Sequence, residues 1–247
     1  MAKVKLADLL VKRGLADSLK EAKALVMAGK VIVAERRVDK PGELVSDEVE
    51  VRVKVGSKYV SRAGDKLESA MDCFGLKNEF EKSICLDVGA STGGFTDCML
   101  RHGASKVFTV DVGTNQLDWK LRNDERVIST EKTDVRKYSF PDSDNVSRVD
   151  WVVADVSFIS LITLVDAFER LSFEGTRLLL MVKPKFELPK DLIPEGGIVV
   201  DTDLIEQSVE RVAAEFSKKK FEVVSTAKSG VTGRFGNQEV FLYLKRT

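Results

Sequence analysis

The stretch Asp-Val-Gly-Ala-Ser-Thr-Gly-Gly-Phe at residues 87–95 constrains the fold more than any other part of this 247-residue sequence. It follows the short apolar segment 84–86 and precedes a helical pattern. The sequence therefore predicts a strand, a glycine turn and the start of a helix, which is the usual cofactor site of an open α/β sheet. Gly89 and the pair Gly93 and Gly94 do not have the G-x-G-x-x-G spacing of a dinucleotide site.

The charge at this turn narrows the choice of cofactor. Asp87 ends the predicted strand, and a carboxylate there would repel a pyrophosphate but would suit a cofactor with positive charge and no phosphate. S-adenosylmethionine, which has a sulfonium and an ammonium group, meets both demands. The other interpretation of Asp87 is a carboxylate that caps the following helix. The predicted cofactor-binding residues of the turn are Asp87, Gly89, Ala90, Ser91, Thr92, Gly93, Gly94 and Phe95.

The larger part of the chain predicts a doubly wound α/β sheet. Strands are expected at 84–88, 106–111, 126–130, 149–155, 176–183, 221–227 and 239–245. Helices are expected at 61–79, 93–102, 114–122, 161–171 and 202–219. Seven strands with interleaved helices indicate a Rossmann-like sheet. No helical pattern separates the last two strands, so they are expected to form an antiparallel hairpin.

The first 55 residues predict a separate small α+β domain, followed by a linker at 56–60 and the α/β domain at 61–247. Two short helices are expected, the second capped by Asp17 or Ser18 and ended by Gly29, with a strand following at 31–33. Residues 1–60 contain 13 Lys/Arg and 9 Asp/Glu, a net charge of +4, whereas the remainder has a net charge of −4. A basic module on an acidic body suggests a polyanionic partner.

Composition argues against several other classes of protein. The three cysteines are scattered and form no C-x-x-C pair, which is typical of reduced thiols in a cytoplasmic protein. A single histidine, His102, and no cysteine pair give no zinc ligand set, so no metal is expected. No signal peptide is visible and no apolar run approaches the roughly 18 residues of a membrane span. The expected location is the cytoplasm, away from membranes.

Polar side chains follow four of the predicted strands. Asp87, Asp111, Asp155 and Lys183 each end a strand, and the carboxyl ends of parallel strands meet at the ligand-binding edge of such a sheet. Asp111 lies about twenty residues after the glycine turn, where an acid can accept both ribose hydroxyls of an adenosine cofactor. Its other interpretation is a carboxylate that caps the next turn. Asp134, after the third strand, is expected near the adenine.

Two further charged residues look like ordinary surface positions when taken alone. Lys66 lies in the helix expected before the sheet, and Glu239 begins the last strand. Lys183 differs from them because five apolar residues precede it and Pro184 ends its strand. The sheet is therefore expected to deliver the amine of Lys183 to the ligand-binding edge.

The residues Lys66, Asp155, Lys183 and Glu239 resemble the Lys-Asp-Lys-Glu tetrad of the FtsJ-like ribose methyltransferases. The sequence is still more similar to the TlyA family, often labelled hemolysin, through residues 61–67, 87–96, 111–113, 155–161, 183–187, 196–197 and 236–239. This resemblance implies S-adenosylmethionine-dependent 2′-O-methylation of ribosomal RNA, with cytidine riboses as the usual targets. It implies that Lys183 acts as the base and that the other three residues position the hydroxyl, with Asp155 also facing the cofactor. Lys185 stands where this family mostly has glutamine.

Residues 1–55 resemble the small RNA-binding domain named after ribosomal small-subunit protein four. The segments that are similar to this domain include residues 9–16, 18–22, 29–31 and 40–42. At the hairpin turn, however, Ala34 and Glu35 replace the usual Asn-Gly pair. The resemblance implies that basic side chains of this domain contact the phosphates of ribosomal RNA or of a ribosomal subunit. The candidate RNA-binding residues are Lys12, Arg13, Lys20, Lys23, Lys30, Arg36 and Arg37.

Three other functions compete with ribose methylation. A membrane-lytic toxin would need an amphipathic or hydrophobic membrane segment, and none is visible. An RNA-binding accessory protein with an inactive methyltransferase fold would not need the complete tetrad. An enzyme that methylates a base nitrogen commonly has an Asn/Asp-Pro-Pro-Tyr motif after the fourth strand, where residues 155–158 read Asp-Val-Ser-Phe. The sequence leaves open the target nucleotide, the ribosomal subunit, the oligomeric state and the role of Lys185.

Overall fold

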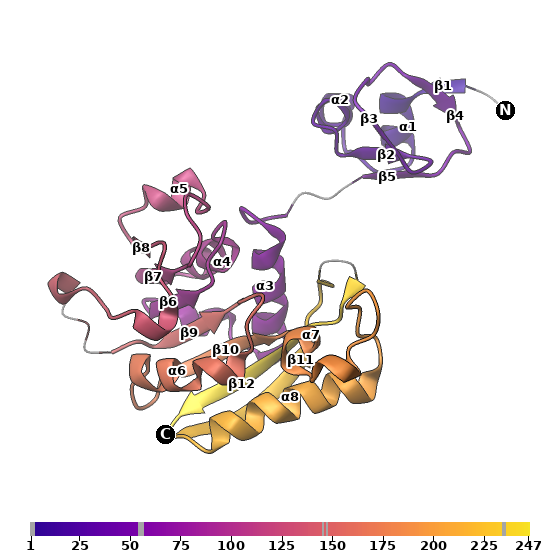
Figure 1. Ribbon diagram of the computed structural model, residues 1–247. Coiled ribbons are helices and arrows are strands. Elements are labelled where there is room, and N and C mark those ends of the chain that lie inside the picture. Colours follow the sequence, from indigo (N-terminus) through magenta and orange to yellow (C-terminus); the bar gives the residue numbers. More distant parts are fainter. Residues whose placement is uncertain (1–2, 54–56, 145, 147, 234–235) are drawn as a thin grey trace. The chain divides into compact units, whose positions relative to one another are not determined.

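The computed structural model describes residues 3–53, 57–144, 146, 148–233 and 236–247. It divides into two compact units, Met1–Gly56 and Ser57–Thr247 (Figure 1). Each unit has its own buried core. Tyr59, predicted from the sequence to lie in the linker, is instead buried in the core of the second unit.

The first unit has the predicted α+β structure. Strand β2 (Val31–Val33) pairs with β3 (Arg36–Val38) and β5 (Val51–Val53), while the short strands β1 (Lys3–Lys5) and β4 (Leu44–Ser46) form a second ribbon. Helices α1 (Leu6–Lys12) and α2 (Leu19–Met27) bury apolar side chains against them. Ser18 caps α2 as predicted, since its hydroxyl accepts a hydrogen bond from the backbone N–H of Glu21.

A two-residue turn at Ala34 and Glu35 joins β2 to β3. Both residues have positive φ, 45° and 65°. A type I′ hairpin turn needs positive φ at both central residues, which is why Asn-Gly is favoured there. The hairpin therefore keeps the tight two-residue connection although its sequence is unfavourable for it.

The second unit contains the seven-stranded sheet, and the predicted α/β fold is confirmed. The strand order is β11-β12-β10-β9-β6-β7-β8, and β12 runs antiparallel to both of its neighbours, as expected for a final hairpin. The strands are β6 (Ile84–Val88), β7 (Lys106–Val110), β8 (Val127–Thr130), β9 (Trp151–Ala154), β10 (Arg177–Val182), β11 (Phe221–Lys228) and β12 (Val240–Arg246).

Helices cover both faces of this sheet (Figure 1). One face packs against α3 (Arg62–Phe74), α4 (Gly94–Arg101) and α5 (Trp119–Arg122), and the other against α6 (Val165–Leu171) and α8 (Thr202–Ser217). Successive residues of β6 alternate between the two cores, with Cys85 in one and Leu86 in the other. Burial on both faces explains why these strands read as continuous apolar runs in the sequence.

Three predicted helices are shorter than expected. The helix expected at 161–171 begins as a 3₁₀ turn at Leu161–Leu164, and α6 starts only at Val165. Of the helix expected at 114–122, only α5 forms, because Asn115 has a φ of 53° and its N–H is bound by Glu131. Asp118 then caps α5 by accepting the N–H of Lys120. The helix expected at 61–79 ends at Phe74, because Gly75 adopts the left-handed conformation (φ 69°), and a 3₁₀ turn follows at Lys77–Phe80.

Candidate active site

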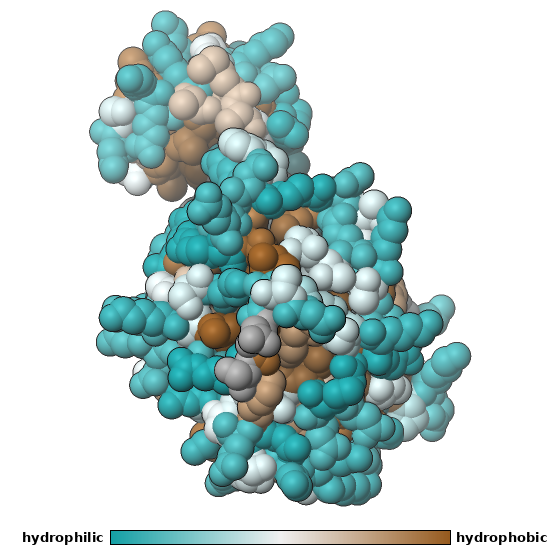
Figure 2. Space-filling model, turned by 90° about the vertical axis from the view of Figure 1, so that its left-hand side faces the viewer, coloured by the Kyte–Doolittle hydropathy of each residue, from teal (hydrophilic) through white to brown (hydrophobic). Residues whose placement is uncertain are grey.

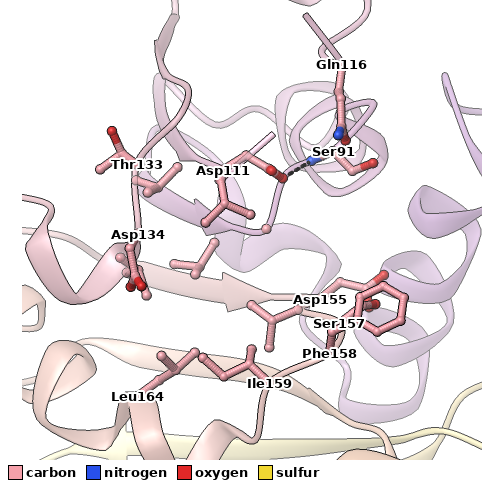
Figure 3. A pocket seen from close by; sticks show the side chains of 16 residues that line it. Ser91, Asp111, Gln116, Thr133, Asp134, Asp155, Ser157, Phe158, Ile159 and Leu164 are labelled. Atoms are coloured by element: carbon pink, nitrogen blue, oxygen red, sulfur yellow. Dashed lines mark hydrogen bonds between the residues drawn. The ribbon is translucent and has the colours of Figure 1, made fainter. Parts of the chain in front are cut away.

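The strand order reverses between β6 and β9, and ligands bind at such a point in open α/β sheets. A cavity of about 360 Å³, here called the first cavity, opens at the carboxyl ends of these strands and of β7 (Figure 3). Polar side chains, among them those of Asp111 and Asp134, lie across it from the apolar side chains of Ile159 and Leu164. The cavity thus combines a carboxylate-bearing wall with an apolar wall.

The glycine turn after β6 places its backbone against the loop that follows β9. Gly89 has a φ of 78°, and a Cβ atom there would lie 3.2 Å from the carbonyl oxygen of Asp155. Ser91 also has positive φ, 49°, and its N–H donates to Asp111 Oδ2 at 2.8 Å. Asp111 Oδ1 accepts the N–H of Gly113 at 2.7 Å. These contacts fix the Asp111 carboxylate in the cavity wall.

Asp134 is held by its neighbour Arg136. Its carboxylate accepts the N–H of Arg136 at 2.9 Å and forms an ion pair with the guanidinium at 2.5 Å. Hydrogen bonds from Arg136 lower the pKa of the Asp134 carboxyl to about 2. The Asp134 carboxyl is therefore ionised at neutral pH, and its charge is balanced by the Arg136 guanidinium.

Asp87 has a different environment from the other candidate acids. It is fully buried, does not line the first cavity, and accepts a hydrogen bond from Thr96 Oγ1 at 2.6 Å, while its other oxygen has no hydrogen-bond partner among the described residues. Burial, aided by the nearby Asp155 carboxylate, raises the pKa of Asp87 to about 7. Among the predicted turn residues, Gly89 and Ser91 line the cavity, whereas Ala90, Thr92, Gly93, Gly94 and Phe95 do not.

The raised pKa of Asp87 predicts that stability falls as pH rises. In the folded state Asp87 keeps its proton up to about pH 7, whereas in the unfolded state it loses the proton above about pH 3.8. The contribution of Asp87 to the free energy of unfolding is therefore complete below about pH 4 and is lost as the pH rises through 7. The expected slope is roughly 1.4 kcal/mol per pH unit between these values. Urea unfolding of the wild type and of Asp87→Asn from pH 4 to 8 measures it. Parallel stability curves for the two proteins would contradict this assignment.

A second cavity, of about 440 Å³, contains all four residues of the predicted tetrad. It shares Ser91, Asp155, Ser157 and Phe158 with the first cavity, so the two adjoin. The structure therefore brings together Lys66, Asp155, Lys183 and Glu239, from positions up to 173 residues apart.

Two ion pairs organise these four side chains. Lys183 Nζ forms an ion pair with Asp155 Oδ1 at 2.7 Å, and it donates a hydrogen bond to Ser157 Oγ at 2.7 Å. Lys66 Nζ donates to Glu239 Oε2 at 2.5 Å. All four side chains are at most 15% exposed. Gly233 lies against the Glu239 carboxylate, where a Cβ would approach Oε1 to 2.5 Å.

Phe158 stands at the boundary of the two cavities. It is 90% exposed, has a φ of 66°, and its ring lies 5.5 Å from that of Phe186. An exposed aromatic residue with strained backbone is typical of a ligand-binding site, not of a folding core. Neither Phe158 nor Ser157 is predicted as a site residue from the sequence, although both lie in the segment 155–161 that resembles the TlyA family.

Glu187 fixes the loop that carries these residues. It is buried, and its carboxylate accepts hydrogen bonds from Ser160 Oγ at 2.5 Å and from the Leu161 N–H at 2.8 Å. Burial raises the pKa of Glu187, and the two hydrogen bonds oppose this rise. Glu187 belongs to α7 (Pro184–Glu187), which begins directly after Lys183. It thereby links the Lys183 segment to the Asp155 loop.

Comparison with known proteins agrees with this geometry. The model of the FtsJ-like methyltransferase family matches residues 59–246, and that of the S4 domain matches residues 4–51. The chain belongs to the FtsJ-like methyltransferase family. It is 40% identical over 238 residues to the 16S/23S rRNA (cytidine-2′-O)-methyltransferase TlyA of Mycobacterium tuberculosis, covering 96% of this chain and 87% of the relative.

Other relatives carry a different label. Hemolysin A of Brachyspira hyodysenteriae is 38% identical over 243 residues, covering 96% of this chain and 97% of the relative. A solved structure from Streptococcus thermophilus, also named a hemolysin, is 40% identical, with a TM-score of 0.75 over 100% of this chain and 90% of the other. In the described part of this methyltransferase, no helix is long and apolar enough to cross a membrane. No cluster of three or more metal-ligating side chains is found within the same residues.

The seven candidate RNA-binding residues are all exposed in the S4 domain: Lys12, Arg13, Lys20, Lys23, Lys30, Arg36 and Arg37. Figure 2 shows one face of the whole protein, and hydrophilic residues cover most of it. Two of the seven already have partners. The Arg13 guanidinium donates to the backbone oxygens of Val49, at 2.6 Å, and Asp47, and Arg36 pairs with Glu43. Arg13 thus ties the end of α1 to the segment before β5.

Proposed function

We propose that this protein transfers a methyl group from S-adenosylmethionine to a ribose 2′-oxygen of ribosomal RNA in the cytoplasm, with cytidine as the target nucleotide. The observation that carries this proposal is the position of Asp155 and Ser157, which line both cavities and both contact Lys183 Nζ. A cofactor in the first cavity and a ribose in the second would meet at this amine. The curated relatives named as rRNA cytidine-2′-O-methyltransferases support the substrate.

The first cavity fits S-adenosylmethionine in its charge. Its charged lining consists of Asp111, Asp134 and Asp155. Asp134 is paired with Arg136 and Asp155 with Lys183, whereas Asp111 accepts only backbone N–H groups among the described residues and keeps its negative charge for a ligand. Such a lining suits a cation without phosphates. Asp111 would accept the ribose hydroxyls and Asp134 would lie near the adenine. When bound, the cofactor supplies an electrophilic methyl group.

The second cavity supplies the base. A ribose hydroxyl is a weak nucleophile until it loses its proton, and an unprotonated amine can accept that proton. In the resting site Lys183 is the cation of the ion pair with Asp155, so its ammonium must release a proton to solvent before the amine can accept the ribose proton, with Asp155 and Ser157 fixing its position. The Lys66–Glu239 pair would orient the hydroxyl from another wall of the same cavity. General base catalysis of this kind typically contributes about 10²–10⁴-fold.

Replacing Asp111 tests the cofactor assignment. Asp111→Ala should weaken S-adenosylmethionine binding more than roughly tenfold, because the lost acceptor leaves the ribose hydroxyls unpaired. Isothermal titration calorimetry measures the affinity. The matched control is Asp203→Ala, an exposed residue at the start of α8, which should bind as the wild type does. Equal affinity for Asp111→Ala and wild type would place the cofactor elsewhere.

The position of the methyl group tests the proposed reaction. The protein is incubated with ribosomal subunits and tritiated S-adenosylmethionine, and the RNA is then hydrolysed in alkali. Because alkaline cleavage uses the free 2′-hydroxyl as its nucleophile, a 2′-O-methyl group leaves an uncleaved, labelled dinucleotide. Label in mononucleotides would refute ribose methylation, and absence of label would refute RNA methylation of these substrates.

A further inference from the structure

The residues that line the second cavity carry more positive than negative charge. Lys66 pairs with Glu239 and Lys183 pairs with Asp155, so the tetrad is internally neutral. Two more cations line the same cavity, and they are Arg62 and Lys185. The tetrad therefore neutralises none of the positive charge of these two side chains.

Arg62 and Lys185 are also free of acidic partners. Neither forms an ion pair or a side-chain hydrogen bond with any residue in the described ranges. The contact of Lys185 is with an aromatic ring, since its Nζ lies 4.8 Å from the centroid of Phe186. A cation over a ring face keeps its charge and its remaining donors for another ligand.

The two cations stand next to the proposed catalytic lysines. Arg62 is the first residue of α3 and precedes Lys66 by four positions, so the two lie on one face of the helix. Lys185 lies in α7, two residues after Lys183. Arg62 and Lys185 thus come from two separate helices, α3 and α7, and each lies close in sequence to one lysine of the tetrad.

We propose that Arg62 and Lys185 bind the RNA backbone phosphates that flank the target nucleotide. This inference rests on the proposed function, because a ribose that enters the second cavity within an RNA strand brings one phosphate on its 5′ side and one on its 3′ side. A neutral tetrad provides no net attraction for these phosphates, whereas two unpaired cations match them in number and sign. Phosphate contacts position a strand without reading its sequence.

Charge removal tests this proposal in the full-length protein. The variants are Arg62→Gln, Lys185→Gln and the double substitution, with Lys220→Gln, an exposed lysine next to the start of β11, as the matched control. Removing one cation–phosphate interaction should lower the slope of log affinity against log salt by about 1, and the double variant should lower it by about 2. Binding of ribosomal RNA is measured at salt concentrations from about 50 to 200 mM, together with steady-state methyl transfer.

The kinetic result expected is a rise in KM for RNA of roughly tenfold per variant, with kcat at saturating RNA within about twofold of wild type. Arg62→Lys and Lys185→Arg keep the charge and should retain most of the salt slope. Unchanged salt slopes in the glutamine variants, or a fall in kcat with an unchanged KM, would overturn the proposal. Failure of the wild type to methylate ribose would instead overturn the proposed function, and the binding slopes would still show whether these cations contact RNA.

Discussion

Lys183→Ala is expected to abolish methyl transfer to RNA while leaving the affinities for S-adenosylmethionine and RNA close to those of the wild type. The amine of Lys183 contacts both Asp155 and Ser157, which line both cavities, and no other lysine amine in the described residues contacts either of them. Loss of a general base is expected to lower the rate by roughly 10²–10⁴-fold. Single-turnover transfer from tritiated S-adenosylmethionine measures the chemical step directly.

Arginine at the same position separates the role of a base from that of a positive charge. Lys183→Arg should be as inactive as Lys183→Ala, because a guanidinium stays protonated and cannot accept a proton. Lys66→Arg should retain part of the activity if Lys66 acts only by its charge. Lys190→Ala, at an exposed position outside both cavities, is the control. A robustly active Lys183→Arg enzyme would exclude the base role.

Removal of residues 1–56 is expected to weaken RNA binding by more than roughly tenfold and to flatten its dependence on salt. The S4 domain has its own core and carries the exposed basic residues proposed to contact phosphates. The first cavity belongs entirely to the second unit, so the affinity for S-adenosylmethionine should not change. Filter binding at several salt concentrations measures the first effect and calorimetry the second.

A full-length variant serves as the control for this deletion. Replacing Lys12, Lys20 and Lys23 with glutamine removes charge without removing the domain, and it should reproduce part of the loss. Arg13 is unsuitable for this purpose, because its guanidinium binds the backbone oxygens of Asp47 and Val49 and its loss would disturb the fold. Equal RNA affinity and equal salt slope in the truncated protein would contradict the assigned role of the S4 domain.

Much of the fold follows from the sequence for simple physical reasons. Strands buried on both faces appear as short apolar runs, and the polar residue that ends each run marks the ligand-binding edge of the sheet. This pattern alone predicts Asp111, Asp155 and Lys183 at the edge, and all three line a cavity. The pattern does not reveal the break at Asn115, because a hydrogen bond to Glu131 in another segment holds that residue outside the helix.

The remaining parts of the site depend on contacts between distant segments. Lys66 and Glu239 look like surface charges in sequence, and only the fold shows that they form a largely buried pair. Asp87 illustrates the opposite case. Its position at a strand end suggests a cofactor ligand, but its side chain points to Thr96 in α4 and does not reach the first cavity. Periodicity identifies strand ends, whereas the direction of each side chain depends on the packing around it.

Nucleoside mass spectrometry of ribosomal RNA tests the central claim most directly. Ribosomal RNA is taken from cells that carry the wild-type gene, no copy of the gene, or the Lys183→Ala variant, and is digested to nucleosides. Ribose methylation by this site predicts a 2′-O-methylcytidine that is present with the wild-type gene and absent in the other two strains. An unchanged set of methylated nucleosides in all three strains, or the loss of a base-methylated nucleoside, would contradict it.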